Sequence, residues 1–499
     1  MLDSLLTAVG TLVQSDIIVY VLLGSALGLF MGAMPGLSSI QGLVLVLPFT
    51  FNMEPMSAMF LYAGIMGAGA VGGAIPSILL RIPGTSVNIA TLLDGYPMTL
   101  RGESAKALGI ASSASAFGTF FGLAILIGFL PIIRSVVLAF SPPEMFMLVL
   151  WGLCSCVVIS RGNMVKGLIA ACLGLALSYI GLSNISGVTR FSFGSVYLAG
   201  AIGIVPFIIG LFGIGQVIKL AVQGSVTAPE KMTTGGGFAE AMNGAIETFR
   251  HKVCFLRSAG IGTLIGIIPG IGGAVANFLS YLVAMQTSRK PETFGKGNTE
   301  GVIASEAANN ASQQGAFLTM LSFGIPGGVE TALLIGIFIL HGLTPGPMLI
   351  REHLDIIWAL ILGIFVSNIL ASGVTLLLAN RLAVIVRIPL SIILPLVSIT
   401  CFVSVFLLRG EILDVLLVLT VGLFSYGFEK YGFSLVALVI GFVMGTLVEV
   451  SFHQSLGMAF GSYTIFFTRP ISLVLFCLVI LTMSLPFLIP RLRSLKRKV

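Results

Sequence analysis

The chain has 499 residues, of which 57% are hydrophobic and only 9% are charged. Because a soluble domain carries about 25% charged residues, this composition excludes a soluble globular protein and indicates one embedded largely in a lipid bilayer. The formal net charge of +7 resides in short polar stretches without interleaved aromatic residues. It therefore does not indicate nucleic acid as a partner.

Apolar runs recur along the whole chain, for example at residues 17–34, 356–380 and 471–490. Each run approaches or reaches the ~20 residues that a spanning helix needs, so the sequence predicts an all-α polytopic membrane protein of about 12 spans. The polar segment 223–257 separates a first membrane repeat at 1–222 from a second at 258–499. Basic residues in that linker and in the tail 491–498 predict that both lie in the cytoplasm, since cytoplasmic loops carry an excess of Lys and Arg.

The two halves share an ordered pair of motifs. Each half contains a Pro-Gly inside an apolar run. In the first half it lies in Gly-Ala-Met-Pro-Gly at 32–36, and in the second half in Gly-Ile-Ile-Pro-Gly at 266–270. An Ile-Pro-Gly follows each one at a similar distance, at 82–84 and 325–327, which predicts an internal duplication. Acidic residues precede the first Pro-Gly and a basic linker precedes the second, so we expect two inverted repeats with discontinuous or re-entrant helices.

Pro-Gly at membrane depth has a chemical consequence. Proline frees a backbone carbonyl and glycine adopts angles that other residues avoid. Lipid cannot satisfy such backbone, so it must face protein or a wet cavity, where it offers carbonyl oxygens to a cation and helix N-termini to an anion. One Pro-Gly would suggest a kink or an interfacial loop, but four in repeat order favour a binding site.

Small polar side chains follow these breaks. Hydroxyls and amides can donate to carboxylate oxygens or offer oxygen atoms to Na⁺, so they suit either ligand. The candidates for binding an organic anion are Ser38, Ser39, Thr85, Ser86, Asn88, Gly327, Gly328 and Thr331. Arg81 is a further candidate, because it could pair with a substrate carboxylate, although anchoring the chain at the membrane interface is an equal alternative.

The densest polar cluster lies at 301–315, where Glu306, Asn309, Asn310 and Gln313 share one face of a predicted helix. An acid and amides beside apolar spans are costly and usually mark an ion pathway. The alternative is a helix cap or an interfacial loop. Our hypothesis places Na⁺ at a set that combines backbone carbonyls of the Pro-Gly breaks with this cluster: Pro35, Gly36, Pro269, Gly270, Glu306, Asn309 and Asn310.

Other chemistries find no support in the sequence. Ser112, Ser113 and Ser115 have no histidine or other base in register, so we expect no enzyme. A phosphate-binding Gly-x-x-x-x-Gly-Lys-Ser/Thr motif is also missing, so we expect no ATP-binding site. We expect no cofactor and no metal other than Na⁺ as a coupling ion.

At these motifs the chain resembles the large membrane subunit of the tripartite tricarboxylate transporter family (TctA-like). The matching strings are Gly-Ala-Met-Pro-Gly at 32–36, Ile-Pro-Gly-Thr at 82–85, Leu-Asp-Gly-Tyr-Pro at 93–97, Lys-Gly-Leu at 166–168, Arg-Phe-Ser-Phe-Gly at 190–194, Phe-Gly-Lys-Gly at 294–297, Glu-Ala-Ala-Asn-Asn-Ala at 306–311 and His-Gly-Leu-Thr-Pro-Gly-Pro at 341–347. The chain departs from the family pattern at Arg81, which is usually polar and uncharged, and at 38–41, which is usually built from Gly, Pro and Thr.

The resemblance implies a small four-span membrane subunit and a periplasmic solute-binding protein as partners, and cation-driven uptake of carboxylates. We therefore predict the large transmembrane subunit of a binding-protein-dependent secondary transporter for organic di- or tricarboxylates, with Na⁺ as coupling ion, in the bacterial inner (cytoplasmic) membrane. An autonomous permease or channel for small organic anions, working without a binding protein, is the alternative. A membrane scaffold without transport activity is a third possibility.

Overall fold

The computed structural model describes residues 2–137, 139–159, 163–183, 185–223, 236–379, 381–382 and 389–496, without the side chains of 86, 134–137, 158–159 and 485–496. The linker and the tail predicted from the sequence fall partly outside these residues, since 224–235 and 497–499 are not described.

The described residues are almost entirely helical, and the one sheet among them is a two-stranded antiparallel ribbon. The elements up to the linker are α1 (Leu2–Leu12), α2 (Ser15–Ala33), α3 (Ser39–Thr50), α4 (Pro55–Gly72), α5 (Ala74–Leu80), η1 (Ser86–Asn88), α6 (Ile89–Leu100), α7 (Ser104–Val137), α8 (Pro142–Ile159), α9 (Met164–Ser178), β1 (Gly181–Leu182), β2 (Thr189–Arg190), α10 (Val196–Ala199), α11 (Ile204–Ile208), η2 (Ile209–Ile214) and α12 (Gly215–Gln223).

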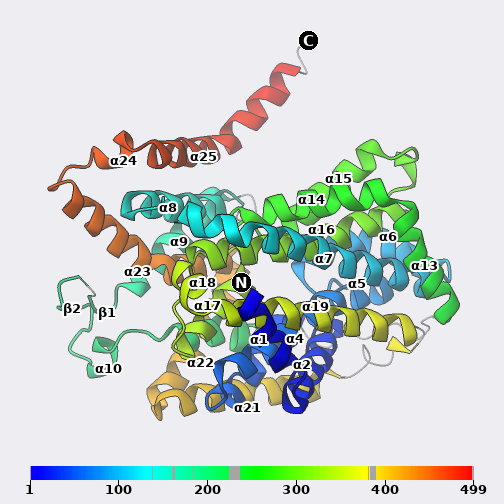
Figure 1. The fold of residues 1–499 in the computed structure, drawn as a ribbon, viewed down its shortest axis with the longest axis horizontal. Helices are drawn as coiled ribbons and strands as arrows, with labels where there is room; N and C mark the ends of the chain where they lie inside the picture. The colour runs from blue at the N-terminus through cyan, green and yellow to red at the C-terminus, as the bar shows by residue number, and fades with distance from the viewer. Residues whose placement is uncertain are drawn as a thin grey trace.

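The elements after it are α13 (Phe238–Arg250), α14 (Lys252–Ile267), α15 (Gly272–Thr287), η3 (Pro291–Thr293), α16 (Thr299–Phe323), α17 (Val329–Leu340), α18 (Pro347–Glu352), α19 (Leu354–Leu377), α21 (Leu390–Arg409), α22 (Ile412–Lys430), α23 (Leu435–Met458), α24 (Ile465–Thr468) and α25 (Pro470–Lys496). The β-ribbon and α10 lie at one end of the long axis of the molecule, and α13 lies at the other (Figure 1).

Eight stretches among the described residues are long and apolar enough to cross a membrane, counting α4 with α5 and α11 with η2 and α12 as single stretches. Six further apolar helical stretches are shorter, at 10–17 residues, among them 142–157 in α8 and 470–484 in α25. These helices confirm the prediction of an all-α polytopic membrane protein. The figure of about 12 spans stays a prediction, since short apolar helices on either side of a break can cross the bilayer together.

Both Pro-Gly motifs interrupt helices as predicted. α2 ends at Ala33 and α3 begins at Ser39, and in the second half α14 ends at Ile267 and α15 begins at Gly272. Gly36 and Gly270 have φ angles of 79° and 76°, in the left-handed region that glycine adopts without a steric penalty. The Ile-Pro-Gly motifs likewise separate α5 from η1 and α16 from α17.

Small residues let the helices before the breaks approach one another closely. A Cβ atom on Gly28 of α2 would lie 2.3 Å from the carbonyl oxygen of Ile65 in α4. A Cβ atom on Gly262 of α14 would lie 2.4 Å from the carbonyl oxygen of Ala308 in α16. In each half, the helix before the Pro-Gly break therefore packs on the helical segment that leads to the Ile-Pro-Gly break. This likeness agrees with the predicted duplication, while the inverted orientation of the repeats stays a prediction.

Helices of the two halves also pack on each other, since α7 contacts α13 and α16 while α4 contacts α19. Because of this interlocking, all four breaks reach the same region of the molecule.

Candidate functional site

A cavity of about 760 Å³ lies where the four breaks meet. Residues from each break line it: Pro35 and Gly36, Pro83 and Gly84, Gly270 to Gly273, and Gly327 and Gly328. Further lining residues come from α3, α4, α8 and α16, and from η2, α12 and the turn between α22 and α23. The cavity is thus bounded by the interrupted helices together with η2, α12 and the turn between α22 and α23.

Helix N-termini converge on this cavity. α3 begins beside Ser38, whose hydroxyl accepts a hydrogen bond from the backbone N–H of Ile40 at 3.3 Å. α17 begins after Gly328, whose N–H donates to Thr331 Oγ1 at 3.0 Å. The starts of α15 and of the η1–α6 segment line the same space. The positive ends of the helix dipoles make such a convergence favourable for an anion.

The structure brings most of the predicted site residues together. Among the predicted substrate-binding residues, Ser38, Ser39, Thr85, Asn88, Gly327, Gly328 and Thr331 line the cavity. The predicted cation-binding residues that line it are Pro35, Gly36, Gly270 and Asn309. The backbone of Ser86 lies in η1, but its side chain lies outside the described residues.

Other predicted site residues do not line the cavity. Arg81 is exposed at the end of α5, and its guanidinium carbon lies 6.0 Å from the centroid of the Tyr96 ring. Its backbone is left-handed with φ 60°, as is that of Gly324 at the matching position of the second half with φ 70°. Pro269 packs toward Gly152 just outside the wall. Glu306 and Asn310 are fully buried behind the wall.

Glu306 lies behind the wall at the level of Asn88. Its carboxylate accepts hydrogen bonds from Asn88 Nδ2 at 3.2 Å, from Ser115 Oγ at 3.0 Å and from Thr91 Oγ1. Among the described residues, no Lys, Arg or His forms an ion pair with it. A buried carboxylate without a basic partner is costly, so a proton or a bound cation must compensate its charge.

Asn310 lies one helical turn further along α16. Its amide nitrogen donates to Thr119 Oγ1 at 3.1 Å, and the amide nitrogen of Asn368 in α19 donates to the same oxygen at 3.0 Å. The polar face predicted on α16 therefore forms buried hydrogen bonds with α7 and, through Thr119, with α19.

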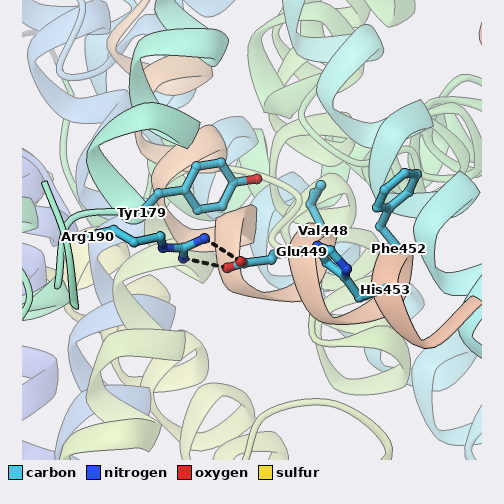
Figure 2. A pocket seen from close by; sticks show the side chains of 6 residues that line it. All are labelled: Tyr179, Arg190, Val448, Glu449, Phe452 and His453. Atoms are coloured by element: carbon cyan, nitrogen blue, oxygen red, sulfur yellow. Dashed lines mark hydrogen bonds and ion pairs between the residues drawn. The ribbon is translucent and has the colours of Figure 1, made fainter. Parts of the chain in front are cut away.

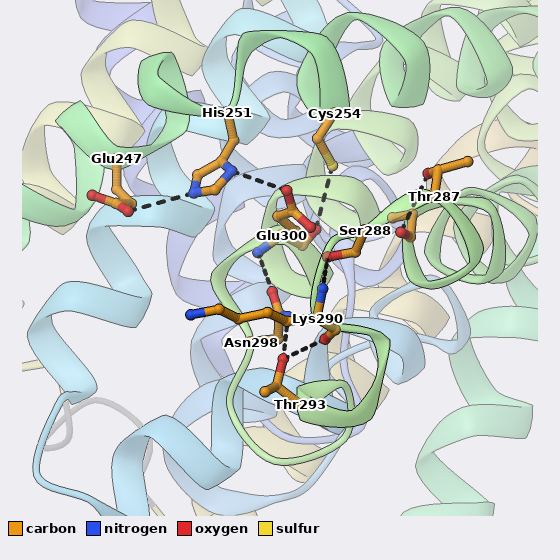
Figure 3. Close-up of polar contacts among 10 residues, drawn as sticks. Glu247, His251, Cys254, Thr287, Ser288, Lys290, Thr293, Asn298 and Glu300 are labelled. Carbon is orange, nitrogen blue, oxygen red and sulfur yellow. Dashed lines mark hydrogen bonds and ion pairs between the residues drawn. The ribbon is translucent and has the colours of Figure 1, made fainter.

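The structure rules out a helix cap or a loop at 301–315. Figure 3 shows the region where α16 begins, with Asn298 accepting a hydrogen bond from the backbone N–H of Glu300 at 2.7 Å. The Glu300 carboxylate in turn pairs with His251, whose Nδ1 lies 3.0 Å from Glu300 Oε1. The cap therefore lies ahead of the cluster, and Glu306, Asn309 and Asn310 stand inside the helix.

Sequence reasoning missed the polar residues that α12 contributes to the cavity lining. The amide of Gln216 in α12 donates to the carbonyl oxygen of Gly36 at 2.5 Å, and the amide of Gln41 donates to the carbonyl oxygen of Phe212 at 2.9 Å. Phe212 lies in the π-helical segment η2, a conformation that is frequent at functional sites. The sequence signal that could have identified this part of the site is the presence of polar residues inside the apolar run 204–223.

The charged residues Lys219 and Glu429 were missed as well. Lys219 Nζ lies 2.9 Å from Glu429 Oε1, and both side chains line the cavity. Glu330, at the start of α17, accepts a hydrogen bond from Gln313 Nε2 at 2.6 Å. The described lining thus carries one basic and two acidic side chains, with Glu306 close behind.

A second, smaller cavity of about 240 Å³ lies beside α23 (Figure 2). Arg190 and Glu449 face each other there in a bidentate ion pair, with nitrogen–oxygen distances of 2.6 and 2.9 Å. The pair neutralises its own charge, and none of the predicted site residues lies in this cavity.

An all-helical polytopic membrane protein with a cavity at converging helix breaks falls within the class of membrane transport proteins. The chain belongs to the tripartite tricarboxylate transporter TctA family, whose sequence model matches residues 18–440. The resemblance read from the motifs is thereby confirmed.

Two similar proteins come from Agrobacterium vitis. One, described as an uncharacterized 52.8 kDa protein in the TAR-I ttuC' 3' region, is 30% identical over 485 residues, covering 97% of this chain and 95% of that protein. The other, an uncharacterized protein in the TAR-II ttuC' 3' region, is 33% identical over 238 residues. The match covers 48% of this chain and 98% of that protein. No solved structure matches the chain significantly.

Proposed function

We propose that this chain is the large transmembrane subunit of a binding-protein-dependent secondary transporter that takes up organic di- or tricarboxylates. In this proposal a periplasmic solute-binding protein delivers the anion, a small four-span subunit completes the membrane complex, and the complex resides in the bacterial inner membrane. Membership of the TctA family supports the tripartite organisation.

The observation that carries the proposal is the convergence of helix N-termini on one cavity lined by Ser38, Ser39, Thr85 and Thr331. The positive dipole ends of these helices favour an anion. The hydroxyls of Ser38, Thr85 and Thr331 donate within the chain to Gln41 Oε1, Asn88 Oδ1 and the Gly328 carbonyl oxygen, and each can turn to donate to a carboxylate oxygen instead. The substrate-binding residues predicted from the sequence thus have a shared space in which one small anion could contact several of them.

The charge of the lining supports coupling to a cation. With two acidic side chains against one basic side chain, and with Glu306 behind them, a carboxylate would enter an environment of excess negative charge. Charges in a poorly hydrated site interact strongly, so anion binding would require neutralisation by cations. We propose Na⁺ at the carbonyl oxygens near Pro35 and Pro269, with Glu306, Asn309 and Asn310 as side-chain partners.

The test is uptake of radiolabelled carboxylates into proteoliposomes that contain this chain and its small subunit, with the matching binding protein outside. We expect uptake only with the binding protein present and an inward Na⁺ gradient imposed. Uptake that needs neither would support the autonomous permease or channel. An absence of saturable uptake under every gradient would favour a scaffold role.

A further inference from the structure

Lys219 is the one basic side chain among the described residues that line the central cavity. It projects from α12, and its ammonium group lies 2.9 Å from Glu429 Oε1 at the end of α22. The Lys219 side chain is 30% exposed and the Glu429 side chain 19% exposed. An incoming ligand can therefore reach both charges without unfolding any element.

The position of α12 sets Lys219 close to the first Pro-Gly break. Gln216 donates to the carbonyl oxygen of Gly36 at 2.5 Å. Lys219 follows Gln216 by three residues, which is a rise of about 4.5 Å along the helix axis. α12 therefore packs directly against the first Pro-Gly break, and Lys219 lines the same cavity as the start of α3.

A purely structural role for the Lys219–Glu429 ion pair explains its position less well than a role in ligand binding. An ion pair that is partly withdrawn from water gains little net stability, because desolvation offsets the attraction. Here both side chains face the cavity lining instead of being enclosed between helices. An ammonium group that faces a ligand cavity favours a role in binding, since it can form strong charge-assisted hydrogen bonds to a carboxylate.

We propose that Lys219 binds a second carboxylate of the substrate, which replaces the Glu429 carboxylate as its partner. One carboxylate of the ligand occupies the helix N-termini and hydroxyls, and the other binds Lys219 in the same cavity. The site therefore selects dicarboxylates over monocarboxylates of equal chain length. Glu429 holds the ammonium group in place until the ligand arrives and weakens ligand binding by competing for it. This inference rests on the proposed function.

The experiment measures binding of radiolabelled succinate and of butyrate, which has one carboxylate fewer, to the purified full-length chain in lipid nanodiscs with Na⁺ present. In Lys219→Met combined with Glu429→Gln, which leaves no unpaired charge, we expect succinate affinity to fall about tenfold to a hundredfold. Butyrate affinity should change by less than about twofold. Lys219→Arg should keep the preference for succinate, because the guanidinium group also binds carboxylates.

Glu429→Gln alone distinguishes binding from structure. Our inference expects tighter succinate binding, because the competitor of the ligand is gone, whereas a structural pair predicts unchanged or weaker binding. Lys430→Met is the matched control, since Lys430 adjoins Glu429 but does not line the cavity, and it should leave the succinate-to-butyrate ratio unchanged.

The outcomes separate the two proposals. A wild-type chain that prefers succinate, with double-variant losses equal for both ligands, would overturn the role of Lys219 and leave the proposed function standing. A wild-type chain that binds no carboxylate at all, in a panel that includes citrate, would overturn the proposed function and this inference with it.

Discussion

At the scale of single residues, Glu306 carries the strongest physical constraint. Its side chain has no exposed surface, and the donors that reach it from Asn88, Thr91 and Ser115 are all uncharged. Such hydrogen bonds disperse the charge of a carboxylate but do not cancel it. A cation that arrives with the substrate would supply the missing positive charge, which makes Glu306 a candidate for coupling ion binding to substrate binding.

We therefore predict that Glu306→Gln retains the fold but loses the dependence of carboxylate uptake on Na⁺. A glutamine amide fits the same space, and the Ser115 and Thr91 hydroxyls can turn to accept its N–H groups. The measurement is the Na⁺ activation curve of uptake in proteoliposomes. Glu300→Gln, on the same helix but paired with His251 away from the cavity, should keep the wild-type curve. A normal Na⁺ response in Glu306→Gln would refute the coupling role.

At the scale of elements, close helix pairs hold the breaks in position. α14 and α16 approach so closely that Gly262 has no room for a Cβ atom, which would lie 2.4 Å from the carbonyl oxygen of Ala308. In membranes, association of helices depends on this kind of close packing, because lipid tails are as apolar as the helices themselves. The geometry of the second Pro-Gly break thus depends on small residues one or two turns before it.

We predict that Gly262→Ala lowers the melting temperature, because overpacking costs about 1–3 kcal/mol. Gly260→Ala is a matched control on the same helix, since no atom lies within 4 Å of a Cβ added there. It should leave stability unchanged or raise it by up to about 1 kcal/mol through the higher helix propensity of alanine. Thermal unfolding of the detergent-solubilised protein, followed by intrinsic fluorescence, measures both. Equal melting temperatures for the two variants would contradict the packing argument.

At the scale of the whole molecule, polar contacts tie the two halves together. Asp94 in α6 is fully buried and accepts hydrogen bonds from Tyr281 Oη at 2.8 Å and from the backbone N–H groups of Gly297 and Asn298 at 2.8 and 2.7 Å. Asn368 Nδ2 donates to the carbonyl oxygen of Gly67 at 3.1 Å. Each half therefore satisfies buried polar groups of the other, and neither half alone could do so.

We expect that two fragments, one ending at Gln223 and one beginning at Gly236, assemble when co-expressed and copurify through a tag on either one. The first fragment expressed alone should aggregate or be degraded, because its buried polar groups would lack partners. Asp94→Ala should reduce copurification severalfold, whereas Asp3→Ala, at an exposed residue of α1, should not. A first fragment that is monodisperse by itself would show that the halves fold independently.

Local patterns were sufficient to predict the class of fold and part of the candidate site. Apolar runs of spanning length indicated membrane helices, because burial in lipid demands apolar side chains over that length. The breaks at Pro35-Gly36 and Pro269-Gly270 were predictable too, since proline and glycine act on the backbone of their own segment. The same reasoning selected the neighbouring Ser38, Thr85 and Thr331, which the structure places around one cavity.

Only the tertiary structure decided how segments distant along the chain come together. Lys219 and Glu429 are 210 residues apart, and nothing in the run around either one indicates the other as its partner. Arg81 adjoins a break in sequence, yet the left-handed end of α5 directs it toward Tyr96 and away from the cavity lining. The physical reason is that periodicity and backbone chemistry are local properties of a segment. The pairing of α12 with the first Pro-Gly break, and of α6 with α16, depends on close packing and hydrogen bonds that exist only when the whole chain has folded.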